Sequence, residues 1–323
     1  MIALLIIAIA AGAASALMFA SIISGALISL LLFYLAPLPL TVTALGWGPL
    51  AAAIGGIAAA ASLGAIFGLP YSIAFAIMVA LPAWWLGHLA LLGRPIEGSA
   101  AEHDGAEPAA PQLEWYPVGR ILVWIAAFAI ITTMGALLTL GTDADTITSA
   151  LRRGLLRVFS ATSAQSGEIE RFVDVVVIVA PIAATIIAMV TLTINLWLAG
   201  KVTQTSGRLN RPWPELRSTE LPPMTLVALL VAIGLSFVGG IVAMLAQIAT
   251  TALIIAYALV GFAVLHTLTL ALPSRGFWLV GTYTVVVIFG WPIVAMVALG
   301  LADAVFGLRQ RFTRGRPPPL PAS

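Results

Sequence analysis

Residues 1–34 read MIALLIIAIAAGAASALMFASIISGALISLLLFY, and this stretch decides the class of fold. It contains no Asp, Glu, Lys or Arg, and the first charged side chain of the whole chain is Arg94. The surface of a water-soluble domain needs charged groups, whereas a charge inside a lipid bilayer is costly. The sequence therefore predicts an all-α protein, a polytopic bundle of transmembrane helices.

Charge is scarce in the rest of the chain as well. Of the 323 residues, 61% are hydrophobic and 9% are charged, and the mean hydropathy is +1.09. Soluble domains carry roughly a quarter charged residues. The net charge of +2 arises largely from a basic tail, which suits anionic lipid headgroups better than nucleic acid. The absence of cysteine excludes disulfides and thiolate chemistry.

The charged residues other than Arg275 fall into four segments, which leave apolar stretches long enough for helices of about 20 residues. Residues 1–34 are predicted to form two short helices that break around 21–25, and Pro37 and Pro39 end this region. Further spans are expected at about 41–67, 70–93, 120–140, 174–198, 223–244, 247–272 and 277–302. The total is eight or nine spans.

This pattern divides the chain into four parts. An uncharged membrane half covers 1–93, and a polar flexible loop rich in Pro, Ala, Gly and Glu covers 94–119. The loop has almost no large aliphatic residues, so it cannot bury enough apolar surface to order itself. A second membrane half covers 120–302, and a basic, Pro-rich tail covers 303–323.

Residues 143–171 differ from the spans because they combine apolar and basic faces. Apolar residues recur at helical spacing at Ile147, Leu151, Leu155 and Phe159, and basic residues occupy other faces at Arg152, Arg153 and Arg157. The pattern predicts an amphipathic helix that lies in the headgroup plane. The alternative is a soluble helix that caps the bundle.

Basic residues also bear on the orientation, because they stay preferentially on the inner side of the membrane. The basic loop at 201–217 and the basic tail at 309–316 are separated by three predicted spans. An odd number would place the two on opposite sides. We place the tail, together with the arginines of 143–171, on the inner side.

Small residues recur at every fourth position in two early helices. One row contains Ala8, Gly12, Ala16, Ala20 and Ser24, and the other contains Gly48, Ala52, Gly56, Ala60, Gly64 and Gly68. Such rows let helix backbones approach closely, although the abundance of Ala and Gly offers a compositional alternative. A row at this spacing drifts around the helix. We therefore expect Gly56, Ala60 and Gly64 to make one tight contact, with Gly48 and Gly68 in turns.

Polar groups inside the spans are few, and they supply the candidate site residues. Asn195, His266 and Tyr283 are the candidates for binding a solute, with an interhelical hydrogen bond or an interfacial position as the alternative. No carboxylate or lysine is expected at mid-membrane depth, which argues against an ion or a strongly anionic substrate. Catalytic motifs are lacking, and the histidines at 88, 103 and 266 are too scattered for a metal site. We expect no enzyme activity, cofactor or metal.

Three stretches together carry a resemblance to a bacterial family. They are Tyr34-Leu-Ala-Pro-Leu-Pro-Leu with Leu45-Gly-Trp-Gly, Asn195-Leu-Trp-Leu-Ala-Gly-Lys201 with Gly207-Arg-Leu-Asn-Arg-Pro-Trp-Pro-Glu-Leu-Arg217, and Gly261-Phe-Ala-Val-Leu-His266 with Gly300-Leu-Ala-Asp-Ala-Val-Phe-Gly-Leu-Arg309. Over nearly its whole length the chain resembles the YybS-like bacterial integral-membrane family of unknown function. The resemblance implies a multi-pass protein of the bacterial inner (cytoplasmic) membrane, without a mechanism.

The N-terminal half also resembles the substrate-capturing membrane subunits of energy-coupling-factor vitamin importers. The likeness rests on the small residues of the first helix and on turns at Pro37, Pro39 and Gly48-Pro49. In those subunits the small-residue row docks onto a transmembrane coupling subunit, which implies Ala8, Gly12 and Ala16 as a docking row. This chain departs from them by its greater length and by residues 143–171.

These observations predict an inner-membrane protein that binds or transports a small neutral or amphiphilic solute. Its expected partners are the lipid bilayer and a transport-coupling or other membrane protein, and not nucleic acid. The alternative is a non-catalytic membrane scaffold whose loop at 201–222, amphipathic segment and basic tail recruit partners.

Overall fold

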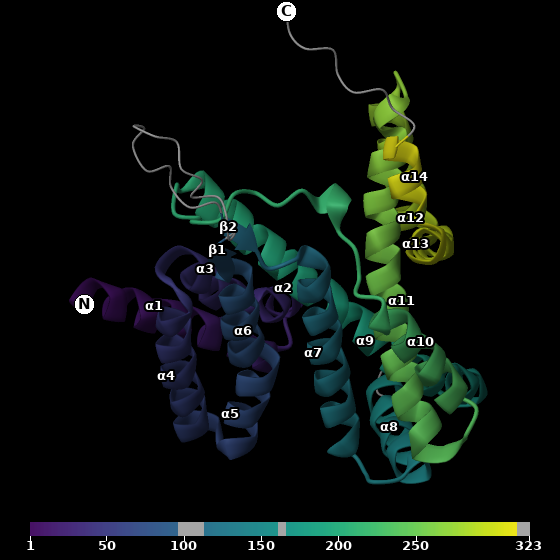
Figure 1. The fold of residues 1–323 in the computed structure, drawn as a ribbon. Coiled ribbons are helices and arrows are strands. Elements are labelled where there is room, and N and C mark those ends of the chain that lie inside the picture. The colour runs from purple at the N-terminus through teal and green to yellow at the C-terminus, as the bar shows by residue number, and fades with distance from the viewer. Residues whose placement is uncertain (96–112, 161–165, 315–323) are drawn as a thin grey trace, which may run out of the picture. The chain divides into compact units, whose positions relative to one another are not determined.

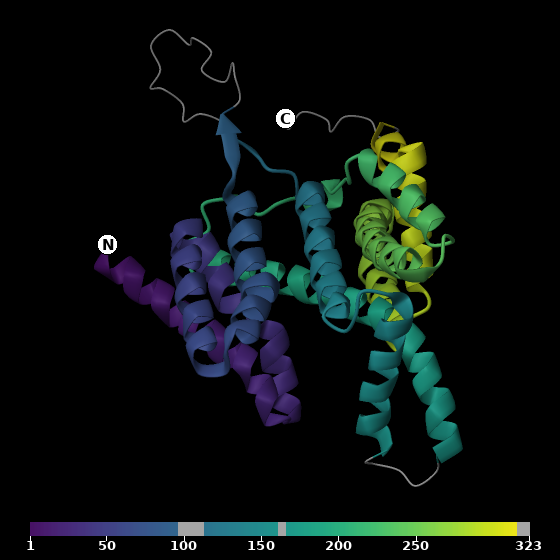
Figure 2. The same ribbon diagram turned by 90° about the horizontal axis from the view of Figure 1, so that it is seen from below.

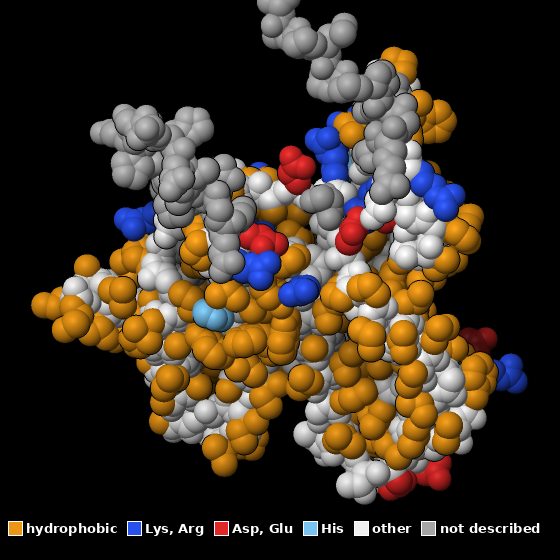
Figure 3. All heavy atoms as spheres, viewed as in Figure 1, with side chains coloured by type: hydrophobic (Ala, Val, Ile, Leu, Met, Phe, Trp, Pro, Cys, Tyr) orange, Lys and Arg blue, Asp and Glu red, His pale blue; other side chains and the backbone are white. Residues whose placement is uncertain are grey.

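The computed structural model describes residues 1–95, 113–160 and 166–314, and these are almost entirely helical (Figure 1). Seven helices in this part are long and apolar enough to cross a membrane: Ile2–Ser24, Leu27–Trp47, Pro49–Phe67, Leu69–Leu91, Val118–Leu138, Gly167–Thr205 and Gly240–Leu268. Hydrophobic side chains cover most of the face shown in Figure 3, as expected for lipid contact. The predicted all-α bundle is confirmed, and the chain is a multi-pass integral membrane protein.

The chain forms two compact units, and each is built from two stretches of sequence. Unit 1 contains Met1–Phe128 and Val190–Pro214, and unit 2 contains Ala129–Met189 and Glu215–Ser323. The helices α7 and α9 contribute residues to both units. The central part of the loop predicted to be flexible, residues 96–112, lies outside the described residues.

The elements of the first part of the chain are α1 (Ile2–Ala20), the 3₁₀ turn η1 (Ser21–Ser24), α2 (Leu27–Leu35), α3 (Pro37–Trp47), α4 (Pro49–Phe67), α5 (Leu69–Phe75), the π-helical turn η2 (Ala76–Ala80), α6 (Leu81–Leu91), β1 (Gly93–Pro95), β2 (Leu113–Trp115) and α7 (Val118–Leu138). The two strands pair antiparallel, with Arg94 opposite Glu114. Helix α9 (Ser166–Thr205) completes unit 1 with its C-terminal part.

Glycines in left-handed conformations set the breaks between the early helices. The predicted break near 21–25 is confirmed, and Gly25 ends η1 with φ of +67°. The single helix expected over 41–67 is wrong, because Gly48 has φ of +98° and separates α3 from α4. Only glycine adopts such angles without strain. Gly68, with φ of +90°, makes the corresponding turn between α4 and α5.

The prolines at 37 and 39 do not end the first membrane region, contrary to the prediction. α3 begins at Pro37 directly after α2, and Leu27–Trp47 together forms one candidate span. A proline in the first turn of a helix costs little, because the backbone N–H that it lacks has no partner there in any helix.

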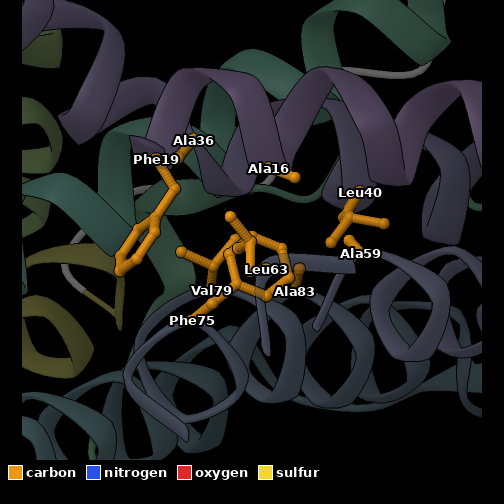
Figure 4. Packing of buried hydrophobic residues seen from close by; sticks show 9 residues of the cluster. All are labelled: Ala16, Phe19, Ala36, Leu40, Ala59, Leu63, Phe75, Val79 and Ala83. Carbon is orange, nitrogen blue, oxygen red and sulfur yellow. The ribbon is translucent and has the colours of Figure 1, made fainter. Parts of the chain in front are cut away.

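The core of unit 1 is built from aromatic and small residues on α1, α3, α4 and the segment from α5 to α6 (Figure 4). The Phe19 and Phe75 rings meet edge to face at 5.5 Å. Beside this core, α1 and α4 pack backbone to backbone. A Cβ built on Gly12 would lie 2.8 Å from the carbonyl carbon of Gly55, so neither position accepts a side chain.

In unit 2, helix α8 (Ala144–Ser160) covers the first part of the expected amphipathic segment. The helix expected over 143–171 is too long, because residues 166–171 form the first turns of α9. Thr146 donates a backbone and a side-chain hydrogen bond to Asp143 at the start of α8, and these bonds hold the pKa of Asp143 below its usual value. The placement of α8 in the headgroup plane stays a prediction.

The apolar face of α8 is covered by other elements of unit 2. Ile147 is fully buried and packs with Leu137 of α7 and Ile248 of α11 (Gly240–Leu268). Figure 2 shows α8 beside the start of α9, where Arg152 Nε is 2.8 Å from an oxygen of Asp174. The exposed faces of α8 therefore carry its remaining basic side chains.

The last five helices of unit 2 are α10 (Met224–Leu235), α11 (Gly240–Leu268), α12 (Arg275–Phe289), α13 (Ile293–Phe306) and α14 (Leu308–Arg314). Two of the predicted spans are therefore wrong. The span expected at 223–244 breaks at Gly239, where φ is +91°. The span expected at 277–302 breaks at Gly290, where φ is +69° and Pro292 follows.

Helices α11 and α13 make the closest helix–helix contact of unit 2. A Cβ built on Gly261 would meet the Met296 backbone, and one built on Gly300 would meet the Tyr257 backbone. Gly261 thus lies beside Met296 and Gly300 lies beside Tyr257, so later residues of α11 meet earlier residues of α13. The two helices therefore run antiparallel.

The basic loop and the basic tail were predicted to lie on opposite sides of the membrane. This prediction is wrong, because the two segments are in direct contact. Arg309 Nη1 donates a hydrogen bond of 2.6 Å to the carbonyl oxygen of Arg217. The chain between these residues therefore returns to the side from which it started. Three spans were predicted between these two basic segments. That number is wrong because the segments broken at Gly239 and Gly290 were each counted as one complete crossing.

Candidate functional site

Two of the three predicted site residues lie together in unit 2. His266 is near the C-terminal end of α11, and its Nε2 is 2.9 Å from the hydroxyl oxygen of Tyr283 on α12. Arg275, the first residue of α12, donates from Nη2 to His266 Nδ1 over 3.4 Å. The Phe262 ring stacks on Tyr283 with centroids 5.1 Å apart. We call His266, Arg275 and Tyr283 the α11–α12 polar cluster.

The hydrogen-bond directions in the α11–α12 polar cluster follow from Arg275. A guanidinium only donates, so His266 Nδ1 must accept. A neutral imidazole then carries its proton on Nε2, which donates to the Tyr283 hydroxyl oxygen. The Tyr283 O–H is left to donate outward, and the buried Nε of Arg275 has no partner among the described residues. The cluster therefore suits a ligand that supplies acceptor oxygens.

The α11–α12 polar cluster is accessible in unit 2 and adjoins apolar surface. Tyr283 is 39% exposed, and His266 and Arg275 are half-buried. On the same helix, Phe277 and Val280 are strongly exposed. A ligand with one polar end and one apolar part would match both kinds of surface.

The third candidate, Asn195, lies in unit 1, where its side chain makes hydrogen bonds that hold helices together. Its Nδ2 donates to the carbonyl oxygens of Tyr34 and Thr191, at 2.8 Å each. Tyr34 lies just before the change from α2 to α3, so this bond ties α9 to that junction. The buried Oδ1 of Asn195 has no hydrogen-bond partner among the described residues. The structure thus separates Asn195 from the other two candidates.

A second polar group in unit 2 is a buried ion pair. Arg309 donates from Nε and Nη2 to Oδ2 of Asp303, at 2.9 and 2.7 Å, and its backbone N–H donates to Oδ1. Glu220 lies 3.7 Å from the same guanidinium. Arg309 was predicted to be part of a basic tail, but here it is neutralised by Asp303 and holds α13 and α14 to the loop at 217.

The basic loop of unit 1 packs its cations on tryptophan rings. Lys201 Nζ lies 3.8 Å from the centre of the Trp213 ring, and Arg208 lies 4.6 Å from that of Trp47. Arg211 donates to the carbonyl oxygens of Ala90 and Tyr116. Burial lowers the pKa of Arg211, although a guanidinium stays charged. These contacts fix the loop to the ends of the helices.

The predicted small-residue row lies on α4, and its central glycines both face the helical segment Leu69–Leu91. A Cβ on Gly56 would lie 3.0 Å from Cβ of Ala80, and one on Gly64 would lie 3.1 Å from Cβ of Ser72. Ala52 is buried, and Ala60 is half-buried beside the core of unit 1. In the first row, Ala8 is fully buried and its backbone lies against Gly55 of α4. The row implied to dock a coupling subunit is thus covered by the chain itself.

Two important residues were missed at the level of sequence. Arg275 interrupts a long apolar region as a lone charge, and that isolation was the available signal for a site residue. Gly55 adjoins Gly56 in the sequence, but the spacing of the row selected only Gly56. His103, one of the three histidines considered for a metal, lies outside the described residues.

No model of a known protein family matches the chain, and no curated protein or solved structure matches it. The resemblance to the YybS-like family therefore stays a prediction.

Proposed function

We propose that this multi-pass membrane protein binds, and by binding transports, a small neutral or amphiphilic solute at the α11–α12 polar cluster. The observation that carries the proposal is the chain of hydrogen bonds from Arg275 through His266 to Tyr283, which leaves the hydroxyl of the exposed Tyr283 as a donor next to exposed apolar side chains. Hydrogen-bonding groups placed at few points of an apolar surface orient a ligand and give specificity.

We further propose that the protein lies in the bacterial inner membrane and resembles the YybS-like proteins. The support is the sequence likeness around residues 34–48, 195–217 and 261–309. A coupling subunit, if one participates, would need a surface other than the covered row on α1.

The test is an untargeted metabolite comparison among strains that carry no copy, the wild-type copy or a His266→Ala copy. We expect the deletion and His266→Ala to change the same metabolites, and Tyr283→Phe to change them partly, because it removes the outward donor alone. Tyr71→Phe, which removes a hydroxyl from unit 1, serves as the matched control and should behave as wild type. All variants must be present in the membrane at equal amounts.

Two outcomes would contradict the proposal. If His266→Ala matched the wild type while the deletion did not, the solute would bind elsewhere. If the deletion changed no metabolite, the scaffold alternative would be favoured. In that case, crosslinking should capture a partner that is lost when the loop cations Lys201 and Arg208 are replaced by glutamine.

A further inference from the structure

We infer that the α11–α12 polar cluster binds the phosphate headgroup of an anionic membrane amphiphile. The inference rests on the proposed function and narrows its solute to one chemical class. It departs from the expectation drawn from the scarcity of charge within the spans, because the cation concerned lies at a helix end.

The first argument is the balance of charge around His266. Arg275 donates to His266, and no carboxylate pairs with its guanidinium among the described residues. The acids of this region face another cation, since Asp303 binds Arg309 and Glu220 lies 3.7 Å from it. The positive charge at the cluster is therefore left for a ligand, and guanidinium groups favour phosphate oxygens.

The second argument is the direction of the hydrogen bonds. The accessible group is the O–H of Tyr283, which donates, and it lies beside the positive guanidinium of Arg275, whose Nε is buried without a partner among the described residues. An ionised phosphate oxygen only accepts and carries negative charge, so it complements this hydroxyl and the nearby cation. A ligand that must donate, such as an ammonium group, would find no acceptor in this arrangement.

The third argument is depth. His266 lies two residues before the end of α11, and Arg275 is the first residue of α12, so both lie where a membrane helix meets the headgroup layer. The outer surface of α12 then exposes Val280 and Val287, which are 67% and 81% accessible. An apolar tail attached to the phosphate would lie along that surface. Free phosphate would gain nothing from it.

The experiment is a titration of the purified full chain in neutral detergent, with the thermal unfolding midpoint as the readout. The probes are a short-chain phosphatidylglycerol, a phosphatidylcholine of equal chain length, and inorganic phosphate. We expect phosphatidylglycerol to raise the midpoint most. Arg275→Gln should weaken its apparent affinity about tenfold, as for loss of a charged hydrogen bond.

Arg153→Gln is the matched control, because it removes the same charge from an exposed position on α8 and should leave the affinity unchanged. Tyr283→Phe keeps the test valid if Arg275→Gln disturbs folding, since it removes only the hydroxyl donor and should also weaken the affinity for phosphatidylglycerol. Equal stabilisation by phosphatidylcholine or by inorganic phosphate would overturn the inference, and so would an equal loss in Arg153→Gln. A neutral amphiphile that depends on His266 and Tyr283 but not on Arg275 would overturn it while leaving the proposed function intact.

Discussion

Single residues matter most here where two backbones touch or where a charge is buried. At Gly261 an added methyl group would lie 2.7 Å from the carbonyl carbon of Met296, and that neighbour is backbone and cannot rotate away. We therefore expect Gly261→Ala to lower the free energy of unfolding by about 1–3 kcal/mol, through separation of α11 and α13. Reversible unfolding in mixed detergent micelles measures this cost.

Gly281→Ala on α12 is the matched control, because its added methyl group would meet no atom within 4 Å. Alanine is intrinsically the better helix former by up to about 1 kcal/mol, so this variant should be neutral or slightly stabilised. Equal destabilisation of the two variants would show that the α11–α13 contact is not as close as described.

The buried ion pair gives a second prediction at this scale. The Asp303 and Arg309 side chains are each 6% exposed. Asp303→Asn would remove the buried carboxylate that binds the Arg309 guanidinium and leave only the exposed Glu220 nearby, and we expect a loss of about 3–5 kcal/mol in unfolding free energy. Asp174→Asn breaks the exposed pair with Arg152 and should cost at most about 1 kcal/mol. A smaller effect at Asp303 than at Asp174 would refute the assignment.

At the scale of the helix, the α4 row leads to a comparison of two neighbouring positions. Gly56 faces Ala80, with 3.0 Å between the added and existing Cβ atoms, whereas the adjacent Ile57 is 70% exposed. Gly56→Leu should overpack this contact and cost about 1–3 kcal/mol, and Ile57→Leu should be nearly silent. If the thermal stability of Gly56→Leu in detergent were unchanged, the row of small residues would be explained by the abundance of Ala and Gly alone.

The helix boundaries were harder to predict from the local sequence than the class of the protein. The absence of charge before Arg94 predicted the membrane class, because the cost of charge in lipid does not depend on the tertiary structure. The breaks at Gly239 and Gly290 were missed, since hydropathy carries no information on backbone angles. Gly239-Gly240 and Gly290-Trp-Pro292 nonetheless contain the glycine and proline residues that are typical of turns.

The site was predictable only in part, for a related reason. His266 and Tyr283 were recognised as polar residues in apolar surroundings, but their pairing depends on how α12 folds back on α11. The bond between Arg309 and Arg217 joins residues 92 positions apart, and no local pattern encodes it. Contacts of this kind decide the topology, and they follow from packing alone.

At the scale of the whole molecule, that bond predicts the sidedness of the basic segments. The natural chain has no cysteine, so single cysteines can be introduced by Asn210→Cys in the loop and Arg311→Cys after α13. We expect a membrane-impermeant thiol reagent to label both from the same side of sealed vesicles, the inner side by the distribution of basic residues. Ile57→Cys, on an exposed apolar face, should resist labelling from either side. Labelling of the two basic positions from opposite sides would be incompatible with the structure.

The short helices of unit 2 also have a consequence for biosynthesis. α10, α12 and α13 contain 12, 15 and 14 residues, which is about 18–22 Å of helix and less than the thickness of the hydrocarbon layer. The translocon releases a segment into lipid when it is apolar over roughly 20 residues, and none of these helices meets that length alone. α10 and α13 both pack against α11, which is long enough to cross the bilayer alone. We therefore expect these short helices to be retained in the bilayer only once α11 has inserted.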